Sequence, residues 1–161
     1  DAALLDQKGK IYSTHLAGAG AFITMMLDYE LGLNNRSLAE DIKRYPLAKV
    51  ESLFHIRMEN GEVVFFENPL NPSLFGKVVV CKEDDFIPIE KRHTMEKIVS
   101  TRKHIKHNVF VNNAIRALTK IAPLGNIRHI PNVVLVGGSA LDSEIPEMIL
   151  TELARYNIVS G

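Results

Sequence analysis

The most informative part of the sequence spans residues 133–146 and reads Val133-Val134-Leu135-Val136-Gly137-Gly138-Ser139-Ala140-Leu141-Asp142-Ser143-Glu144-Ile145-Pro146. Its first four residues are all apolar, which predicts a fully buried strand in a central, parallel position. Two glycines then turn the chain, and a helix is expected from Ser143 or Glu144 to Tyr156, with Pro146 tolerated in its first turn. A buried strand that leads through a glycine turn into a helix is typical of an α/β fold.

The glycine turn is also a candidate binding site. Because Gly137 and Gly138 carry no Cβ, a flat ligand could lie against their bare backbone. The following helix would add free N–H donors, and open α/β sheets bind ligands at the carboxyl ends of central strands. An ordinary tight turn between a strand and a helix explains the same residues, so the spacing alone leaves both interpretations open.

A second glycine turn, Gly18-Ala19-Gly20, precedes an apolar helix expected over residues 21–31. It offers the same close approach to the backbone, and the alternative is glycine-mediated packing of the helix against a sheet. One face of this helix carries Phe22, Met25, Met26 and Tyr29, and another carries Ile23 and Leu27. Apolar residues on two faces predict a buried helix.

The remaining elements predict a core of residues 1–44 and 90–161 around a β-rich insert of about residues 45–89. Residues 1–15 are expected to form a hairpin closed at Gly9, and Asn60-Gly61 predicts a second hairpin inside the insert.

Two helices frame the expected insert. Ser37 is expected to cap a short helix that reaches Arg44, with Glu40 completing a capping box. The stretch from Glu90 to Ala122 is expected to contain the longest helix, which Pro123 and Gly125 end.

Basic and metal-ligating residues lie on this longest helix. Arg102 and Lys106 are four positions apart and share a face that could contact a ribose or a phosphate; the alternative is a solvated basic face. His104 and His107 could touch one metal ion, but no carboxylate or thiol at ligand spacing completes the set in this stretch. Cys81 lies in an apolar strand and is interpreted as a small buried hydrophobe rather than a nucleophile.

The composition excludes several classes of protein. The chain has 161 residues, of which 46% are hydrophobic and 24% charged, as expected for one globular domain rather than a disordered chain. Nineteen basic residues balance nineteen acidic ones, so we expect neither a nucleic-acid partner nor a membrane surface. One cysteine excludes an internal disulfide. Because the first residue is Asp1 rather than Met, we expect a piece of a longer protein.

The order of these elements resembles the second lobe of the actin and heat-shock-chaperone ATPase superfamily, an actin-like (ribonuclease H-like) α/β fold with a small α+β insert. In that superfamily a hairpin carries the second phosphate loop, and a glycine turn after His-Leu opens the next helix. Here the glycine turn is His15-Leu16-Ala17-Gly18-Ala19-Gly20. The superfamily's adenosine motif is an apolar strand followed by Gly-Gly-Ser, which here is Val136-Gly137-Gly138-Ser139.

Within the superfamily, the sequence is similar to the large, chaperone-like ATPase subunit of diol and glycerol dehydratase reactivating factors. The similarity extends over nearly the whole chain, and its most specific part is the run Tyr45-Pro46-Leu47-Ala48-Lys49-Val50-Glu51-Ser52. It is also carried by Thr14–Gly20, Leu38–Glu40, Leu53-Phe54, Val109–Val111, Arg116–Leu118, Val134–Ser139 and Glu144–Pro146.

The resemblance implies a chaperone-like ATPase that acts on coenzyme-B12-dependent diol or glycerol dehydratases. With ATP or ADP and Mg²⁺ as cofactors, such a factor releases damaged cobalamin through a conformational switch set by the nucleotide. The implied partners are the small subunit of the factor and the dehydratase. The implied location is the cytoplasm, with a bacterial microcompartment as a possible site of association.

The resemblance also implies roles for individual residues. Gly137 and Gly138 would form the backbone floor under the adenosine, with Ser139 as a hydrogen-bond partner. Gly18 or Gly20 would approach the nucleotide from the other side, and Arg102 and Lys106 would lie against the adenosine. Asp1 would close the second phosphate loop and face Mg²⁺ through water.

Two departures from the superfamily pattern limit these expectations. Chaperone relatives place an arginine after Gly-Gly-Ser to stack on adenine, whereas this chain has Ala140 and Leu141. The first phosphate loop and the glycines of the second are absent, so we expect ATP hydrolysis by the full protein and none by this segment alone. The alternatives are a small-molecule (sugar-type) kinase lobe of the same superfamily and an interaction module with a vestigial nucleotide site.

Overall fold

The computed structural model describes residues 1–15, 19–83 and 85–160, and the chain divides into two compact units. Unit 1 consists of residues 1–21 and 106–161, and unit 2 consists of residues 22–105. Each unit contains both helices and strands, which confirms the mixed α/β class. The expected β-rich segment, residues 45–89, lies inside unit 2 together with helical residues on both sides of it.

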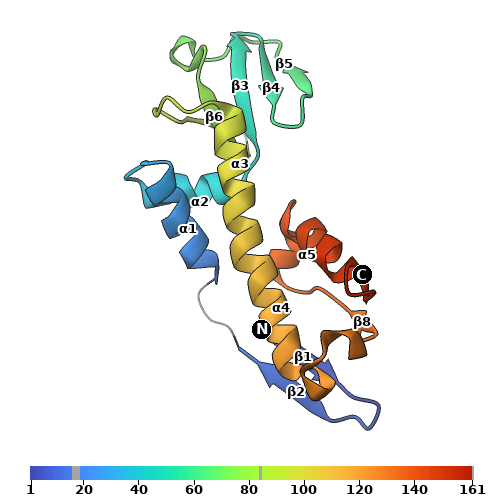
Figure 1. Ribbon diagram of the computed structural model, residues 1–161. Helices are drawn as coiled ribbons and strands as arrows, with labels where there is room; N and C mark the ends of the chain where they lie inside the picture. The colour runs from blue at the N-terminus through green and yellow to red at the C-terminus, as the bar shows by residue number, and fades with distance from the viewer. Residues whose placement is uncertain (16–18, 84, 161) are drawn as a thin grey trace. The chain divides into compact units, whose positions relative to one another are not determined.

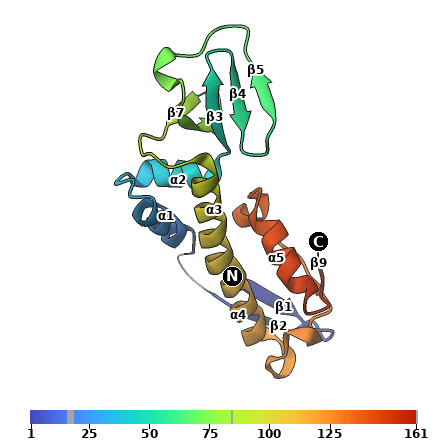
Figure 2. The same ribbon diagram turned by 45° about the horizontal axis from the view of Figure 1, so that its top comes forward.

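Unit 2 is built on an antiparallel sheet of five strands in the order β5-β4-β3-β6-β7. The strands are β3 (Leu47–Ser52), β4 (His55–Met58), β5 (Val63–Phe65), β6 (Val78–Lys82) and β7 (Asp85–Pro88). Figures 1 and 2 show β3, β4 and β5 side by side. The Asn60-Gly61 turn joins β4 to β5 with Arg57 opposite Val63, as the sequence predicted.

Part of the core of this sheet comes from alternation along β3. In β3, Ala48 and Val50 are buried whereas Lys49 and Glu51 point to solvent. One face of the sheet therefore closes over a core. That core consists of Ala48, Val50, Ile56, Leu74 and Val79.

Helix α1 (Ala19–Glu30) is buried on one face only. Ile23 and Leu27 are fully buried, and between them Thr24 Oγ1 donates to Glu40 of helix α2 (Arg36–Arg44) at 2.5 Å. Phe22 and Tyr29 are 46% and 82% exposed. The prediction that both apolar faces are buried is therefore wrong within the described residues, because the packing contacts lie on the Ile23 and Leu27 side.

Helix α2 begins one residue earlier than the sequence predicted. Asn35 caps it, and its side-chain oxygen accepts a hydrogen bond from Leu38 N at 3.0 Å. Ser37 lies inside the first turn, and Glu40 contacts Thr24 and Lys43 instead of closing a capping box. The capping-box prediction is wrong because an equally good cap stands two positions earlier.

The longest helix, expected within residues 90–122, is divided in the structure. Helix α3 (Met95–Lys106) begins after Thr94, whose hydroxyl accepts from Lys97 N at 3.2 Å. A π-helical turn, η2 (His107–Val111), and helix α4 (Asn112–Ile121) follow. None of these helices, and no other helix in the described residues, is long and apolar enough to cross a membrane.

Unit 1 packs a hairpin and two helices around a second core. Strands β1 (Ala2–Leu5) and β2 (Ile11–Thr14) pair antiparallel with Leu5 opposite Ile11, which confirms the predicted hairpin (Figure 1). Ala2 and Leu4 pack against a core to which α4 and helix α5 (Ile145–Ala154) both contribute buried residues. This core includes Val111, Leu118, Ile121, Ile145, Ile149 and Leu153.

The apolar run before the glycine turn does not form the buried central strand that the sequence predicted. Strand β8 (Asn132–Val133) is two residues long and pairs in parallel with β9 (Val159–Ser160). Val134 and Val136 are 72% and 83% exposed. The parallel pairing is confirmed, and the predicted burial is not found, because β9 is the one hydrogen-bonded neighbour of β8 within the described residues.

Candidate functional site

The turn after β8 presents bare backbone to open space. Gly137 has φ of 92°, a conformation that an L side chain rarely adopts, and the short 3₁₀ helix η5 (Gly138–Leu141) follows directly. Ala140 N donates to Gly137 O at 3.0 Å and closes the turn. A Cβ built on Gly138 would meet no heavy atom within 4 Å. Steric contacts within the described structure therefore do not require glycine at position 138.

A cavity of about 550 Å³ lies within unit 1 beside this turn. Val136 and Ala140, which flank the glycines, line it together with Asp1 and Ala19. Most other lining side chains are apolar, and Asn113 and Asn132 add amide groups. The volume and lining suit a small organic ligand with a flat, largely apolar part and a few polar atoms. Of the predicted site residues that the structure describes, Asp1 itself lines this cavity. The two glycine turns border it through their neighbours Ala19, Val136 and Ala140.

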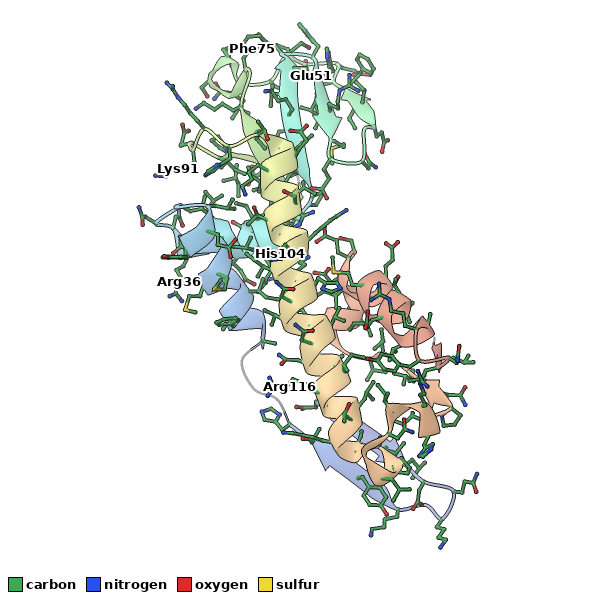
Figure 3. The ribbon with its side chains drawn as sticks, viewed as in Figure 1. Arg36, Glu51, Phe75, Lys91, His104 and Arg116 are labelled. Carbon is green, nitrogen blue, oxygen red and sulfur yellow. The ribbon has the colours of Figure 1, made fainter. Side chains whose placement is uncertain are left out.

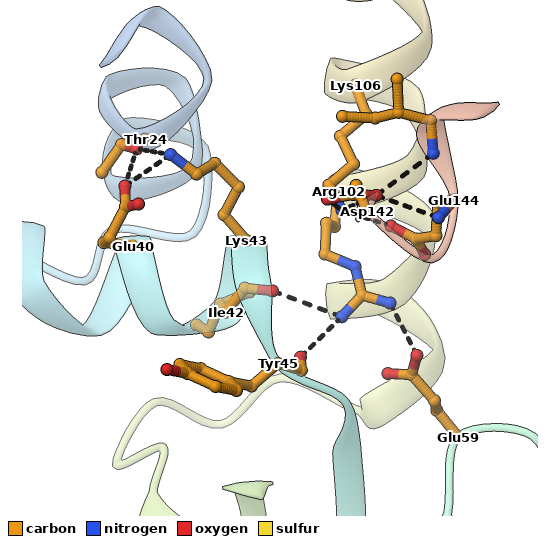
Figure 4. Close-up of polar contacts among 11 residues, drawn as sticks. Thr24, Glu40, Ile42, Lys43, Tyr45, Glu59, Arg102, Lys106, Asp142 and Glu144 are labelled. Atoms are coloured by element: carbon orange, nitrogen blue, oxygen red, sulfur yellow. Dashed lines mark hydrogen bonds and ion pairs between the residues drawn. The ribbon is translucent and has the colours of Figure 1, made fainter. Parts of the chain in front are cut away.

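Lys106 anchors the chain directly after the turn (Figure 4). Its side chain is 2% exposed, and its Nζ lies 2.8 Å from both Asp142 Oδ2 and Glu144 Oε2. Asp142 Oδ1 also accepts hydrogen bonds from the backbone N–H groups of Glu144 and Ile145, at 2.9 and 3.1 Å. Burial raises the pKa of Asp142, but the Lys106 ammonium and these N–H groups outweigh it and hold that pKa below its ordinary value.

Arg102 has an equally enclosed position within unit 2. It is 2% exposed, and its Nη2 donates to Glu59 Oε1 at 2.8 Å (Figure 4). Its Nη1 donates to the carbonyl oxygens of Ile42 and Tyr45, at 3.3 and 3.4 Å. The alternative of a solvated basic face is therefore wrong for both Arg102 and Lys106, because each inward-facing cation is neutralised by a carboxylate from elsewhere in the chain.

The other predicted site residues are placed as follows. The Asp1 carboxylate contacts the His15 ring, and both side chains are 72% exposed. Gly20 lies in the first turn of α1, Ser139 contributes its backbone to η5, and Gly18 lies outside the described residues. Contacts with a nucleotide remain predictions for Gly137, Gly138, Ser139, Gly18, Gly20, Arg102 and Lys106, as does a metal role for Asp1.

The acidic partners of the two buried cations were not predicted from the sequence. Asp142 had a local signal, because an acidic residue just before a helix with proline in its first turn is a typical N-terminal cap. Glu59 had none, since 43 residues separate it from Arg102.

The remaining candidates for chemistry are the histidines of the longest helix and Cys81. His104 lies on α3, where Figure 3 labels it, and the described residues hold no group of three or more His, Cys, Asp or Glu side chains arranged to bind a metal ion. Burial, together with the charge of Glu59, raises the pKa of the Cys81 thiol to about 11. A thiol held in its protonated form is a poor nucleophile, in line with the interpretation of Cys81 as a small hydrophobe.

The fold and the turn define a mixed α/β module with a glycine turn on a small cavity, and comparison with known proteins identifies its family. The model of the diol dehydratase reactivase ATPase-like domain matches residues 1–161. The chain therefore belongs to that family.

About half of the residues of this chain are identical in relatives from this family. It is 53% identical, over all of its 161 residues, to the propanediol dehydratase-reactivating factor large subunit of Citrobacter freundii, of which it covers 26%. It matches a solved diol dehydratase-reactivating factor in nucleotide-free form with a TM-score of 0.93 and 52% identity. It matches a solved glycerol dehydratase reactivase with a TM-score of 0.91 and 51% identity. In both structures 99% of this chain is covered and 26% of the other, so the chain spans about a quarter of the length of these relatives.

Proposed function

We propose that the chain supplies the adenosine side of the nucleotide site in a chaperone-like, actin-like ATPase. The protein would reactivate coenzyme-B12-dependent diol or glycerol dehydratase by releasing damaged cobalamin. Family membership and the similarity to reactivating-factor large subunits support the choice of client. The same membership favours this function over a sugar-type kinase lobe.

The observation that carries the proposal is the bare backbone of Gly137 and Gly138 beside the cavity. Neither the φ of Gly138 nor a neighbouring atom requires glycine at this position. A ligand in the open space above Gly138 would explain why the residue has no side chain. Gly137 and Gly138 would form the floor for the adenine and ribose, and Ser139 would offer a hydrogen bond. Gly18 or Gly20 and Arg102 would complete the proposed contacts, and Asp1 would hold Mg²⁺ through water. Lys106 would belong to the site through Asp142 and Glu144, which it contacts directly after the turn.

Bound nucleotide would supply the free energy that switches the protein between two conformations. ATP hydrolysis would belong to the full protein, and this segment alone would be inactive. We further propose the small subunit of the factor and the dehydratase as partners, and a cytoplasmic location with association with a microcompartment. Residues 1–44 and 90–161 would form the ATPase core around an insert of about residues 45–89.

Two substitutions at position 138 test the proposal in the full-length protein. Gly138→Ala places a methyl group in the open space, and Gly138→Asp adds a negative charge there; neither should disturb the fold, since a Cβ meets nothing within 4 Å. We expect a stepwise loss of Mg²⁺-ADP affinity in calorimetric titrations and a parallel loss of reactivation of an inactivated dehydratase. Gly125→Ala is the control for a general loss of stability, because Gly125 is a turn glycine of unit 1 with φ of 69°, where a side chain is strained, and lies outside the proposed site. It should lower stability and leave ADP affinity unchanged.

The outcomes separate the alternatives. Wild-type protein that binds no nucleotide but still reactivates the dehydratase would establish the interaction module with a vestigial site. Full ADP affinity in Gly138→Asp would show that the nucleotide does not lie on this turn.

A further inference from the structure

The Lys106 cluster lies immediately beyond the glycine turn and is built differently from a surface ion pair. One ammonium, 2% exposed, faces two carboxylates whose side chains are 15% and 9% exposed. An isolated ammonium in such a place would be strongly destabilised, so the two carboxylates are required to keep Lys106 charged. The three side chains of this cluster therefore hold one another in place within unit 1.

The hydrogen-bonding capacity of Lys106 is used within this cluster. An ammonium has three N–H donors. Its Nζ lies 3.0 Å from Asp142 Oδ1, 2.8 Å from Asp142 Oδ2 and 2.8 Å from Glu144 Oε2. Lys106 could donate to a nucleotide only by giving up one of these contacts.

Asp142 connects the Lys106 cluster to the glycine turn. It directly follows η5 (Gly138–Leu141), and its Oδ1 accepts the backbone N–H groups of Glu144 and Ile145 at the start of α5. One carboxylate thus follows the glycine turn, accepts two backbone N–H groups where the next helix begins and holds the buried ammonium. If the ammonium is lost, two buried carboxylates face each other and the end of the turn loses its anchor.

We propose that Lys106 is a positioning residue, which holds the Gly137–Leu141 turn in its binding geometry through Asp142 and Glu144 without touching the nucleotide. The inference rests on the proposed function, because the geometry that it preserves is that of the proposed adenosine floor. It differs from a direct contact of Lys106 with the adenosine in what Asp142 is expected to do.

Asp142→Asn in the full-length protein distinguishes the two roles. The asparagine oxygen can still accept from the N–H groups of Glu144 and Ile145, but Lys106 loses its charged partner at this position. A positioning role predicts that affinity for Mg²⁺-ADP falls, by about tenfold. A direct contact predicts unchanged or tighter binding, because the ammonium is freed to reach the ligand.

Substitutions of Lys106 complete the test. Lys106→Met is expected to weaken ADP binding by about tenfold or more, and Lys106→Arg to restore most of it, because a guanidinium also donates to two carboxylates. Amide exchange at Glu144 and Ile145 should accelerate in Lys106→Met without nucleotide, a readout that does not depend on binding. Lys43→Met is the matched control, since it removes an ammonium, 16% exposed, that contacts Glu40 and Thr24 in unit 2. It should lower stability and leave ADP affinity within about twofold of wild type.

Each result has a defined meaning. Wild-type affinity in Asp142→Asn, or in folded Lys106→Met, would overturn the positioning role while leaving the proposed function intact. Absence of ADP binding by the wild type would overturn both. If Lys106→Met fails to fold, Asp142→Asn decides between the two roles.

Discussion

Replacing Arg102 by methionine tests whether this cation is a structural anchor of unit 2. Methionine keeps much of the apolar stem but removes the guanidinium that links three parts of the unit. Glu59 then loses its contact at 2.8 Å, and the carbonyl groups of Ile42 and Tyr45 lose a donor. These carbonyls lie at the carboxyl end of α2, so the loss should be concentrated where α2 leads into β3.

The magnitude follows from the burial of the pair. Removing one partner of a buried ion pair costs about 3–5 kcal/mol, because the other charge is left without compensation. Glu59 is 20% exposed and keeps the hydrogen bond from Leu47 N at 2.9 Å, which limits the penalty. We therefore expect a loss of about 3 kcal/mol in the free energy of unfolding. In the double variant, Glu59→Gln removes the carboxylate charge that Arg102→Met leaves without a partner cation, and it should recover part of that loss.

Native-state hydrogen exchange measures this loss in the segments where it should occur. The free energy of opening for amide groups of α2 and β3 should fall in Arg102→Met. Arg57→Met is the control, because Arg57 also contacts a glutamate at 2.8 Å but is 45% exposed, and we expect no measurable change. Equal effects of the two substitutions would refute the argument from burial. A loss of ADP affinity with unchanged opening free energies would instead support direct contact between Arg102 and the nucleotide.

Two further predictions concern a helix cap and the Asp142 carboxylate. Asn35→Ala should destabilise unit 2 by about 1 kcal/mol and Ser37→Ala by much less, because Asn35 and not Ser37 caps α2; equal shifts in thermal unfolding would contradict the assignment. Since the pKa of Asp142 is lowered from 3.8, its ionised form stabilises the fold above that pH, and the contribution is lost as the pH falls through the lowered pKa. The stability difference between wild type and Asp142→Asn should therefore shrink below about pH 3.8 in urea titrations, and a constant difference from pH 7 to pH 3 would rule the linkage out.

Local sequence signals were sufficient where the structure depends on neighbouring residues. Asn60-Gly61 predicted the β4–β5 hairpin, and the turn at Gly9 predicted the β1–β2 hairpin. Both predictions succeeded because the residues of a hairpin turn largely set its conformation. Cap positions are less certain from sequence, since Asn35 and Ser37 are both good N-terminal caps and only the helix start distinguishes them.

Signals of the same kind failed where burial depends on distant parts of the chain. The run Val133–Val136 has the composition of a central strand, yet β8 pairs with β9 over two residues and leaves Val134 exposed. The π-helical turn η2 was also invisible, because one extra residue in a turn changes the helical period too little to detect in a single sequence. Strand β3 was missed although Lys49 and Glu51 alternate with buried residues.

Arg102 and Lys106 show how a helical pattern can be right about position and incomplete about role. Arg102 follows Ile98 by four positions and precedes Ile105 by three, a spacing that puts the three residues on one helical face, and all three are buried in the structure. A cation on such a stripe needs an anion from elsewhere in the fold, since burial without one would be prohibitive. The identity of that anion is decided by folding, here 43 residues from Arg102 and 36 residues from Lys106. A basic residue in the middle of an apolar helical face is therefore better interpreted first as half of a buried ion pair. It becomes a candidate ligand contact only where its donors outnumber the acceptors that the fold supplies.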